Sequence, residues 1–321
     1  MKEVTFIRQN IEKWKKMEKV ADKANRIHPD ELADAYTEIT ADLAFSQSHY
    51  PDSRITIYLN NLSSSLHNEI YRNKKEKWTR IITFWTDEMP RIIYSARREL
   101  LISLLIFTVC ALIGIFSTAS ESDSFSRLIL GDQYVDMTLD NIAKGKPMAI
   151  YGSSTQLPMF FSIVFNNVKV AFFCFTMGIF TSIGTGIMLM QNGIMIGTFQ
   201  TFMFQHGVGF QSMLAIWLHG TLEISAAIIA GGAGIALGNG LLFPGTYSRL
   251  VSFKMSAMRG LKIVIGTVPI FILAGFVESF ITRYTTIPAI IRITFILLSL
   301  AFIIFYYIYL PKKKYHERIK T

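Results

Sequence analysis

Long apolar stretches between residues 100 and 310 are the feature that most constrains this chain. A helix needs roughly 20 apolar residues to cross a bilayer. We expect membrane spans at residues 100–116, 160–182, 184–204, 213–237, 261–281 and 290–310. With 51% hydrophobic residues, the composition is typical of a polytopic membrane protein rather than a soluble one. The sequence therefore predicts an all-α membrane helix bundle of about six spans, residues 99–311.

The charged residues between these stretches predict the orientation. The loop 117–159 carries more acidic than basic side chains, whereas the segment before the first span, the loop after the fourth and the tail 312–321 are basic. The positive-inside bias then places both termini in the cytoplasm, for a chain in the cytoplasmic (inner) membrane. It also accounts for the net charge of +9 without a nucleic-acid partner. No charged residue lies between spans two and three, around residues 181–186. The sequence there fits two full spans and also fits two re-entrant half-helices.

The polar N-terminal region, residues 1–77, predicts a cytosolic helical module. Two apolar stripes recur at helical spacing, one after Pro29 and one after Pro51. Their members are Leu32, Ala35, Tyr36, Ile39 and Leu43, then Ile55, Tyr58, Leu59, Leu62, Leu66 and Ile70.

Residues 78–98, "WTRIITFWTDEMPRIIYSARR", combine aromatic and basic side chains just before the first span. Trp78 and Trp85 share a face with several aliphatic residues, while Arg91, Arg97 and Arg98 supply positive charge. This pattern is typical of an amphipathic helix at the membrane interface. A packing helix of the soluble module fits the same pattern, and the sequence does not separate the two interpretations.

His219 and Glu223 stand four residues apart within an apolar span, "HGTLEISAAIIAGGAGIALG", and so share one helix face. A metal site would need a third ligand, and none is evident. An intramembrane hydrolase would need a nucleophile motif, which is also missing. We therefore favour a polar clamp that bonds a neighbouring helix, with no catalytic residue, metal or cofactor. The other candidate members are Asn166, Asn167, Lys169, Gln191 and Asn192.

Glycines at four-residue spacing predict close helix packing, because small residues let backbones approach in lipid. The candidates at this spacing are Gly193 with Gly197, and Gly234 with Gly238, which continue the spacing from Ala230; Gly231 lies beside that series. Glu278 and Arg292 lie either side of a short polar turn, where a helical hairpin would bring them together as a possible ion pair.

Four stretches in order resemble the stage II sporulation protein M family. They are "ADLAFSQSHYPDSRITIYLNNL", "FWTDEMPRIIYSARRELL", "FNNVKVAFFCFTMGIFTSIGTGIMLMQNGIMIG" and the "HGTLEISAAIIAGGAGIALG" segment. The resemblance implies a membrane anchor and scaffold. The namesake belongs to an engulfment complex with two secreted peptidoglycan-degrading partners. The N-terminal module is longer than in the short sporulation form, so this chain resembles the longer branch.

We therefore expect a non-enzymatic scaffold or subunit of a cell-envelope complex, linked to peptidoglycan remodelling. Its expected partners are membrane lipids, other envelope or cell-wall proteins and a second copy of the chain. The alternative is a transporter or channel for a lipid or small solute, which would use the intramembrane polar residues.

Overall fold

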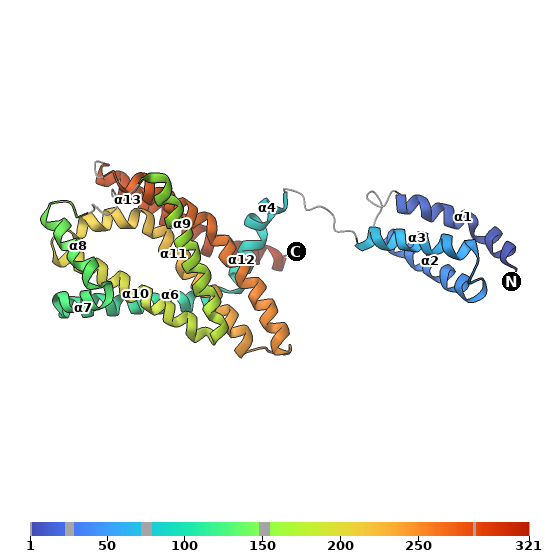
Figure 1. Ribbon diagram of the computed structural model, residues 1–321, viewed down its shortest axis with the longest axis horizontal. Coiled ribbons are helices and arrows are strands. Elements are labelled where there is room, and N and C mark those ends of the chain that lie inside the picture. The colour runs from blue at the N-terminus through green and yellow to red at the C-terminus, as the bar shows by residue number, and fades with distance from the viewer. Residues whose placement is uncertain (1, 23–28, 72–78, 148–154, 285–286, 321) are drawn as a thin grey trace. The chain divides into compact units, whose positions relative to one another are not determined.

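The computed structural model describes residues 2–22, 29–71, 79–147, 155–284 and 287–320. All regular elements within these residues are helices, which confirms the predicted all-α class (Figure 1). The chain divides into two compact units, Met1–Lys77 and Trp78–Thr321.

The first unit is a three-helix module with its own core. Its helices are α1 (Glu3–Asp22), α2 (Pro29–His49) and α3 (Arg54–Tyr71). Trp14 of α1, Ile39 of α2 and Leu59 of α3 are fully buried against one another. The indole of Trp14 donates a 2.8 Å hydrogen bond to Asp42, which satisfies its only polar group. Both predicted apolar stripes therefore line this core.

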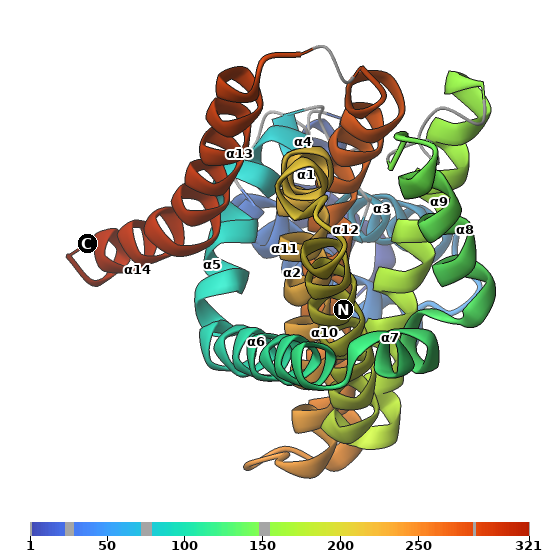
Figure 2. The ribbon, with the colours of Figure 1, turned by 90° about the vertical axis from the view of Figure 1, so that its left-hand side faces the viewer.

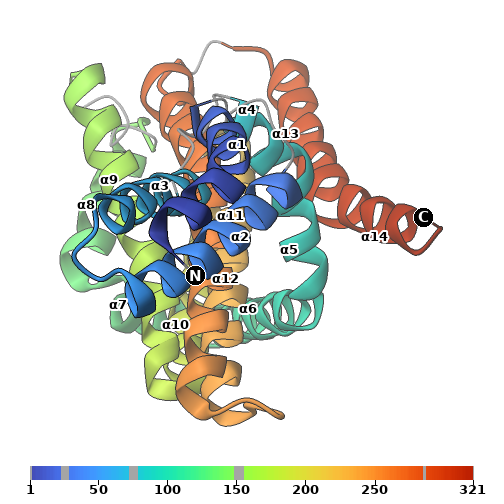
Figure 3. The ribbon, with the colours of Figure 1, turned by 90° about the vertical axis from the view of Figure 1, so that its right-hand side faces the viewer.

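The second unit begins with a short segment that packs on the membrane bundle. It comprises α4 (Thr79–Thr83), the π-helical turn η2 (Phe84–Glu88) and α5 (Met89–Ser95). Met89 and Ile93 are buried in the core of the bundle, where Gly266 leaves room for the methionine side chain. The chain then turns sharply at Ala96 into α6 (Arg97–Ser120), as Figure 3 shows. The segment thus belongs to the membrane unit, and not to the N-terminal module.

Within the described residues, five helical segments are long and apolar enough to cross a membrane. The second, Gln156–Gln205, has 50 residues. At 1.5 Å per residue that is about 75 Å, whereas the hydrocarbon layer is about 30 Å thick. This 50-residue segment is interrupted at Thr181, where φ is +64°, and so consists of α9 (Gln156–Thr176) and α10 (Thr181–Gln205). The turn η4 (Met177–Phe180) joins these helices of 21 and 25 residues, and counting them separately brings the five segments close to the expectation of about six spans.

The remaining spans follow as long helices with local π-helical turns. They are α11 (Gly209–Leu242), α12 (Arg249–Phe276) with η5 (Val277–Thr282), and α13 (Ala289–Ile304) with η6 (Phe305–Tyr309) and α14 (Leu310–Lys320). This number and order of apolar helices makes the chain a multi-pass membrane protein.

Helix α11 is the centre of the bundle, and it contacts α6, α9, α10, α12 and α13 (Figure 2). Its second half is buried almost throughout because it consists largely of alanine and glycine. Gly234 lies against Thr185 and the carbonyl of Cys174, and Gly238 against the backbone of Ser182. Gly231 leaves room for Leu189 and Ser103. Small residues on this helix therefore set how closely its neighbours approach.

Helices α6 and α10 pack closely through three glycines. A Cβ atom added to Gly197 would lie 2.1 Å from the carbonyl oxygen of Ala111, and one added to Gly193 would lie 2.7 Å from that of Phe107. On α6, a Cβ at Gly114 would lie 2.4 Å from the carbonyl oxygen of Ile194. The predicted Gly193–Gly197 pair is thus one side of a mutual contact between backbones.

The segment between α6 and α9 carries two further helices, α7 (Ser122–Leu130) and α8 (Asp132–Ala143). They lie at the end of the bundle opposite the C-terminus (Figure 1). Val135 of α8 is fully buried against Phe202 and Met203 near the end of α10. The segment is therefore a folded cap on that end of the bundle.

Replacing Gly197 by alanine should destabilise the bundle by about 1–3 kcal/mol, because the new methyl group overlaps a backbone carbonyl that has no room to move. Gly186→Ala in the same helix is the matched control, since a Cβ there meets nothing within 4 Å. It should be neutral or stabilising by up to about 1 kcal/mol. Unfolding of both variants in mixed micelles measures the difference, and equal effects would contradict the predicted contact.

Candidate functional site

The polar residues of α11 meet two other helices inside the bundle. Glu223 accepts a hydrogen bond from the side-chain amide of Asn167 on α9. His219, which is only 4% exposed, shares a 3.1 Å hydrogen bond between its Nδ1 atom and the hydroxyl of Thr282 on η5. We call His219, Glu223, Asn167, Glu278 and Thr282 the polar cluster. It joins α9, α11 and the end of α12.

Glu278 completes this cluster from the π-helical turn η5. Its Oε2 atom lies 3.9 Å from Nε2 of His219. One ligand atom from each of His219, Glu223 and Glu278 lies within 4.8 Å of the other two. A π-helical turn often marks a functional site, because it changes which side chains a helix directs inward. Here it directs both Glu278 and Thr282 towards α11.

The charges of the cluster are unbalanced. Among the described residues, no lysine or arginine nitrogen lies within 4.0 Å of Glu223 or Glu278, and the basic group within that distance of Glu278 is His219. Two carboxyl groups at membrane depth are costly without a positive partner or a proton. The cluster therefore needs positive charge or protons from outside the residues that form it.

A cavity of about 390 Å³ adjoins the cluster. His219 and Glu223 form part of its wall, together with residues of α7, α8 and α10. Tyr134, Gln200 and Trp217 supply further polar atoms there, and the indole of Trp217 donates a 3.3 Å hydrogen bond to Gln200. One side of the cluster is thus open to a small molecule or ion rather than closed by packing.

Two family models match the chain. The model described as "Stage II sporulation protein M" matches residues 103–283, which is more than half of the chain. This protein belongs to the stage II sporulation protein M family. A second model, "Domain of unknown function (DUF8413)", matches residues 4–72 of the N-terminal module. No curated protein and no solved structure matches the chain.

All five residues of the polar cluster fall within the part that matches the stage II sporulation protein M model. The cluster includes only three of the predicted clamp residues, namely His219, Glu223 and Asn167. Three other predicted members, Asn166, Lys169 and Gln191, are exposed on the surface of the bundle. Asn192 donates instead to the carbonyl of Met188 in its own helix.

The structure does not bring the predicted pair Glu278 and Arg292 together. Arg292 is buried, and its guanidinium donates to the carbonyl of Tyr284 at 2.9 Å. Glu278 faces His219 instead. No pattern in the sequence predicts the π-helical turn that produces this arrangement. The sequence gives a weaker signal, because Glu278 is one of the few ionisable residues within the apolar region.

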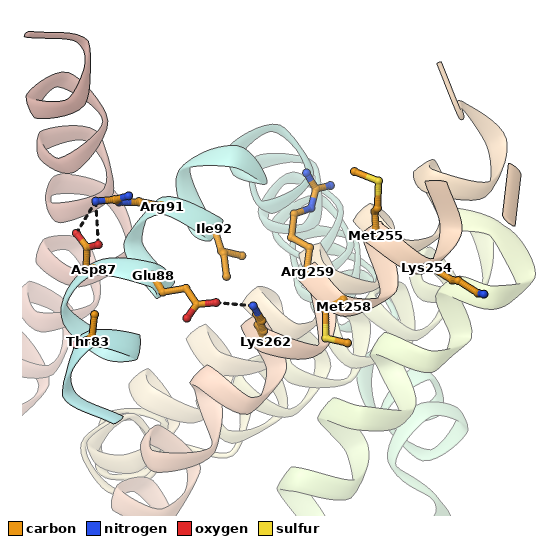
Figure 4. A pocket seen from close by; sticks show the side chains of 10 residues that line it. All are labelled: Thr83, Asp87, Glu88, Arg91, Ile92, Lys254, Met255, Met258, Arg259 and Lys262. Atoms are coloured by element: carbon orange, nitrogen blue, oxygen red, sulfur yellow. Dashed lines mark hydrogen bonds and ion pairs between the residues drawn. The ribbon is translucent and has the colours of Figure 1, made fainter. Parts of the chain in front are cut away.

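A second polar site lies at the opposite end of the bundle, between the segment before α6 and the start of α12 (Figure 4). It is an open pocket of about 770 Å³. Glu88 forms an ion pair with Lys262, and Asp87 pairs with Arg91 at 2.8 Å. The Glu88–Lys262 pair holds the segment before α6 on α12, a role that the sequence did not reveal for Lys262, whereas the Asp87–Arg91 pair lies within that segment.

The other residues predicted at the membrane interface differ in their surroundings. Trp85 is half-buried, and Arg97 and Arg98 are exposed at the start of α6. The guanidinium of Arg97 lies 4.3 Å above the ring of Tyr94. Trp78 lies outside the described residues.

Asn167→Ala should destabilise the bundle by about 1–2 kcal/mol, because it removes the donor to a carboxylate within the membrane. Asn166→Ala is the matched control: this neighbouring side chain is exposed, and its removal should change stability by no more than about 0.5 kcal/mol. Unfolding in mixed micelles tests both. If Asn166→Ala cost as much as Asn167→Ala, the assigned helix face would be wrong.

Proposed function

We propose that this protein is a non-enzymatic scaffold subunit of a cell-envelope complex linked to peptidoglycan remodelling. The observation that carries the proposal is the folded cap α7–α8. Val135 fixes it to the end of α10, while Leu128 is 77% exposed on its surface. A structured element outside the spans suits contact with another protein, and Leu128 gives its surface an apolar side chain.

Ion pairs between α7 and α8 stabilise the shape of the cap. Arg127 pairs with Asp136 at 2.7 Å and with Asp132 at 3.2 Å, so it ties α7 to α8. These hydrogen bonds raise the pKa of the Arg127 guanidinium. Because a preformed surface loses less entropy on association, this arrangement favours recognition by a protein partner.

The geometry of the polar cluster does not favour a catalytic function. Thr282, His219 and Glu278 superficially resemble a nucleophile, base and acid. The hydroxyl of Thr282, however, is 3.3 Å from the carbonyl of Val277, to which it donates, and its side chain is buried away from the cavity. A nucleophile has to reach its substrate. We therefore assign the cluster to holding the helices together.

The distribution of charge supports a bacterial inner membrane with both termini in the cytoplasm. Arg97, Arg98 and Lys312 line one groove of about 620 Å³, so the first and last spans start and end on the same side.

The groove is otherwise largely apolar, between α6 and α13. A basic rim over an apolar groove suits a membrane lipid with a phosphate headgroup, which is one proposed partner. A second copy of the chain is another.

Photo-crosslinking tests the scaffold proposal. A photoreactive phenylalanine analogue at Leu128 should form adducts with an envelope protein in cells, because that side chain is exposed on the cap. The same group at Val135 is the control, since that position is buried and should give none. Adducts with lipid only, or purified protein that hydrolyses peptidoglycan by itself, would contradict the proposal.

The cavity beside Glu223 favours a second candidate, transport of a lipid or small solute. Glu223→Gln separates the two functions, because it removes the acid but keeps an oxygen that accepts from Asn167. A transporter should assemble normally and lose flux in proteoliposomes. A scaffold should keep the Leu128 adducts and show no flux in either form. Flux through the parent chain that Glu223→Gln abolishes would overturn the scaffold assignment.

A further inference from the structure

We infer that His219, Glu223 and Glu278 form a binding site for one divalent transition-metal ion of the zinc class. This goes beyond a scaffold role and does not depend on it. The three ligand atoms come from α11 and η5 and lie within 4.8 Å of one another. In a metal site they would stand roughly 3–4 Å apart, given bonds of about 2.0–2.2 Å, so the cluster needs to contract only slightly.

Hydrogen bonds orient the imidazole for this role. The hydroxyl of Thr282 donates to the carbonyl of Val277, so its oxygen is left to accept from Nδ1 of His219. His219 also makes a hydrogen bond with the backbone of Ala215, one turn earlier. These contacts fit the tautomer with the proton on Nδ1, in which Nε2 carries a lone pair directed at the cluster. A second hydrogen bond that fixes the tautomer is typical of a metal-binding histidine.

The same tautomer leaves two acceptors facing each other. Nε2 of His219 and Oε2 of Glu278 are 3.9 Å apart, which is too long for a hydrogen bond. A lone pair and a carboxylate repel unless a positive species lies between them. On the far side, Asn167 holds Glu223 in place through its amide. The arrangement thus presents three electron-pair donors to one point.

Charge balance indicates a divalent ion. Two ionised carboxylates and a neutral imidazole carry a charge of about −2, and a single M²⁺ cancels it within the membrane. The mixed nitrogen and oxygen ligands suit zinc or another first-row transition metal, whereas Mg²⁺ and Ca²⁺ prefer oxygen ligands only. The adjoining cavity of about 390 Å³ gives an entry route and room for a water or solute ligand.

The test uses the full-length chain in detergent, freed of any affinity tag and treated with a chelator. Titration with Zn²⁺, followed by gel filtration and elemental analysis, should give about one zinc per chain and a raised unfolding temperature. Mg²⁺ in excess should not displace it. Glu278→Gln should weaken Zn²⁺ binding about 10-fold or more, and Thr282→Val, which removes the partner of Nδ1, by about 10–100-fold.

Asp123→Asn is the matched control. It removes a carboxylate 3.6 Å from Nε2 of His206 on the exposed cap and should leave the affinity unchanged. Absence of stoichiometric zinc in the parent chain at pH 6–8 would overturn the inference, because protons would then neutralise the carboxylates. Unchanged binding in Glu278→Gln, or an equal loss in Asp123→Asn, would overturn it as well.

Discussion

The cost of placing carboxyl groups inside a membrane is the constraint on which the arrangement of helices depends. Glu223 and Glu278 have no lysine or arginine within 4.0 Å among the described residues, so each depends on groups from neighbouring helices. Asn167 of α9 donates a hydrogen bond to Glu223, whereas Glu278 faces Nε2 of His219 on α11 at 3.9 Å and needs a proton or a cation there. Because these groups stand on separate helices, satisfying them fixes how α9, α11 and α12 lie relative to one another.

Small residues then allow the helices to approach closely enough for those bonds to form. The half of α11 that follows Glu223 is mainly alanine and glycine, and α10 meets α6 through Gly193 and Gly197. Lipid offers no hydrophobic drive for helices to associate, so close backbone packing and a few polar bonds have to hold the bundle together. The polar cluster and the glycine contacts therefore act together to hold the helices of the bundle in place.

The six apolar helices were predictable, because hydropathy and length depend on composition alone. The glycine contacts could be predicted from the spacing of the glycines. The residues that form the polar cluster could not be predicted from spacing. Successive residues of a helix point about 100° apart, so Asn167 faces Glu223 while Asn166 is exposed. Glu278 enters through a π-helical turn that no local pattern marks, and for that reason the predicted clamp did not include it.

Cross-linking of α9 to α11 tests this account most directly. Cysteines would replace Asn167 and Glu223 in a chain whose buried Cys110 and Cys174 are alanines, with a protease site at the turn near Gly207. A short thiol crosslinker should keep the two halves joined after cleavage, whereas cysteines at Asn166 and Glu223 should leave them separate. Equal cross-linking in both variants, or a higher yield with the Asn166 variant, would contradict the account.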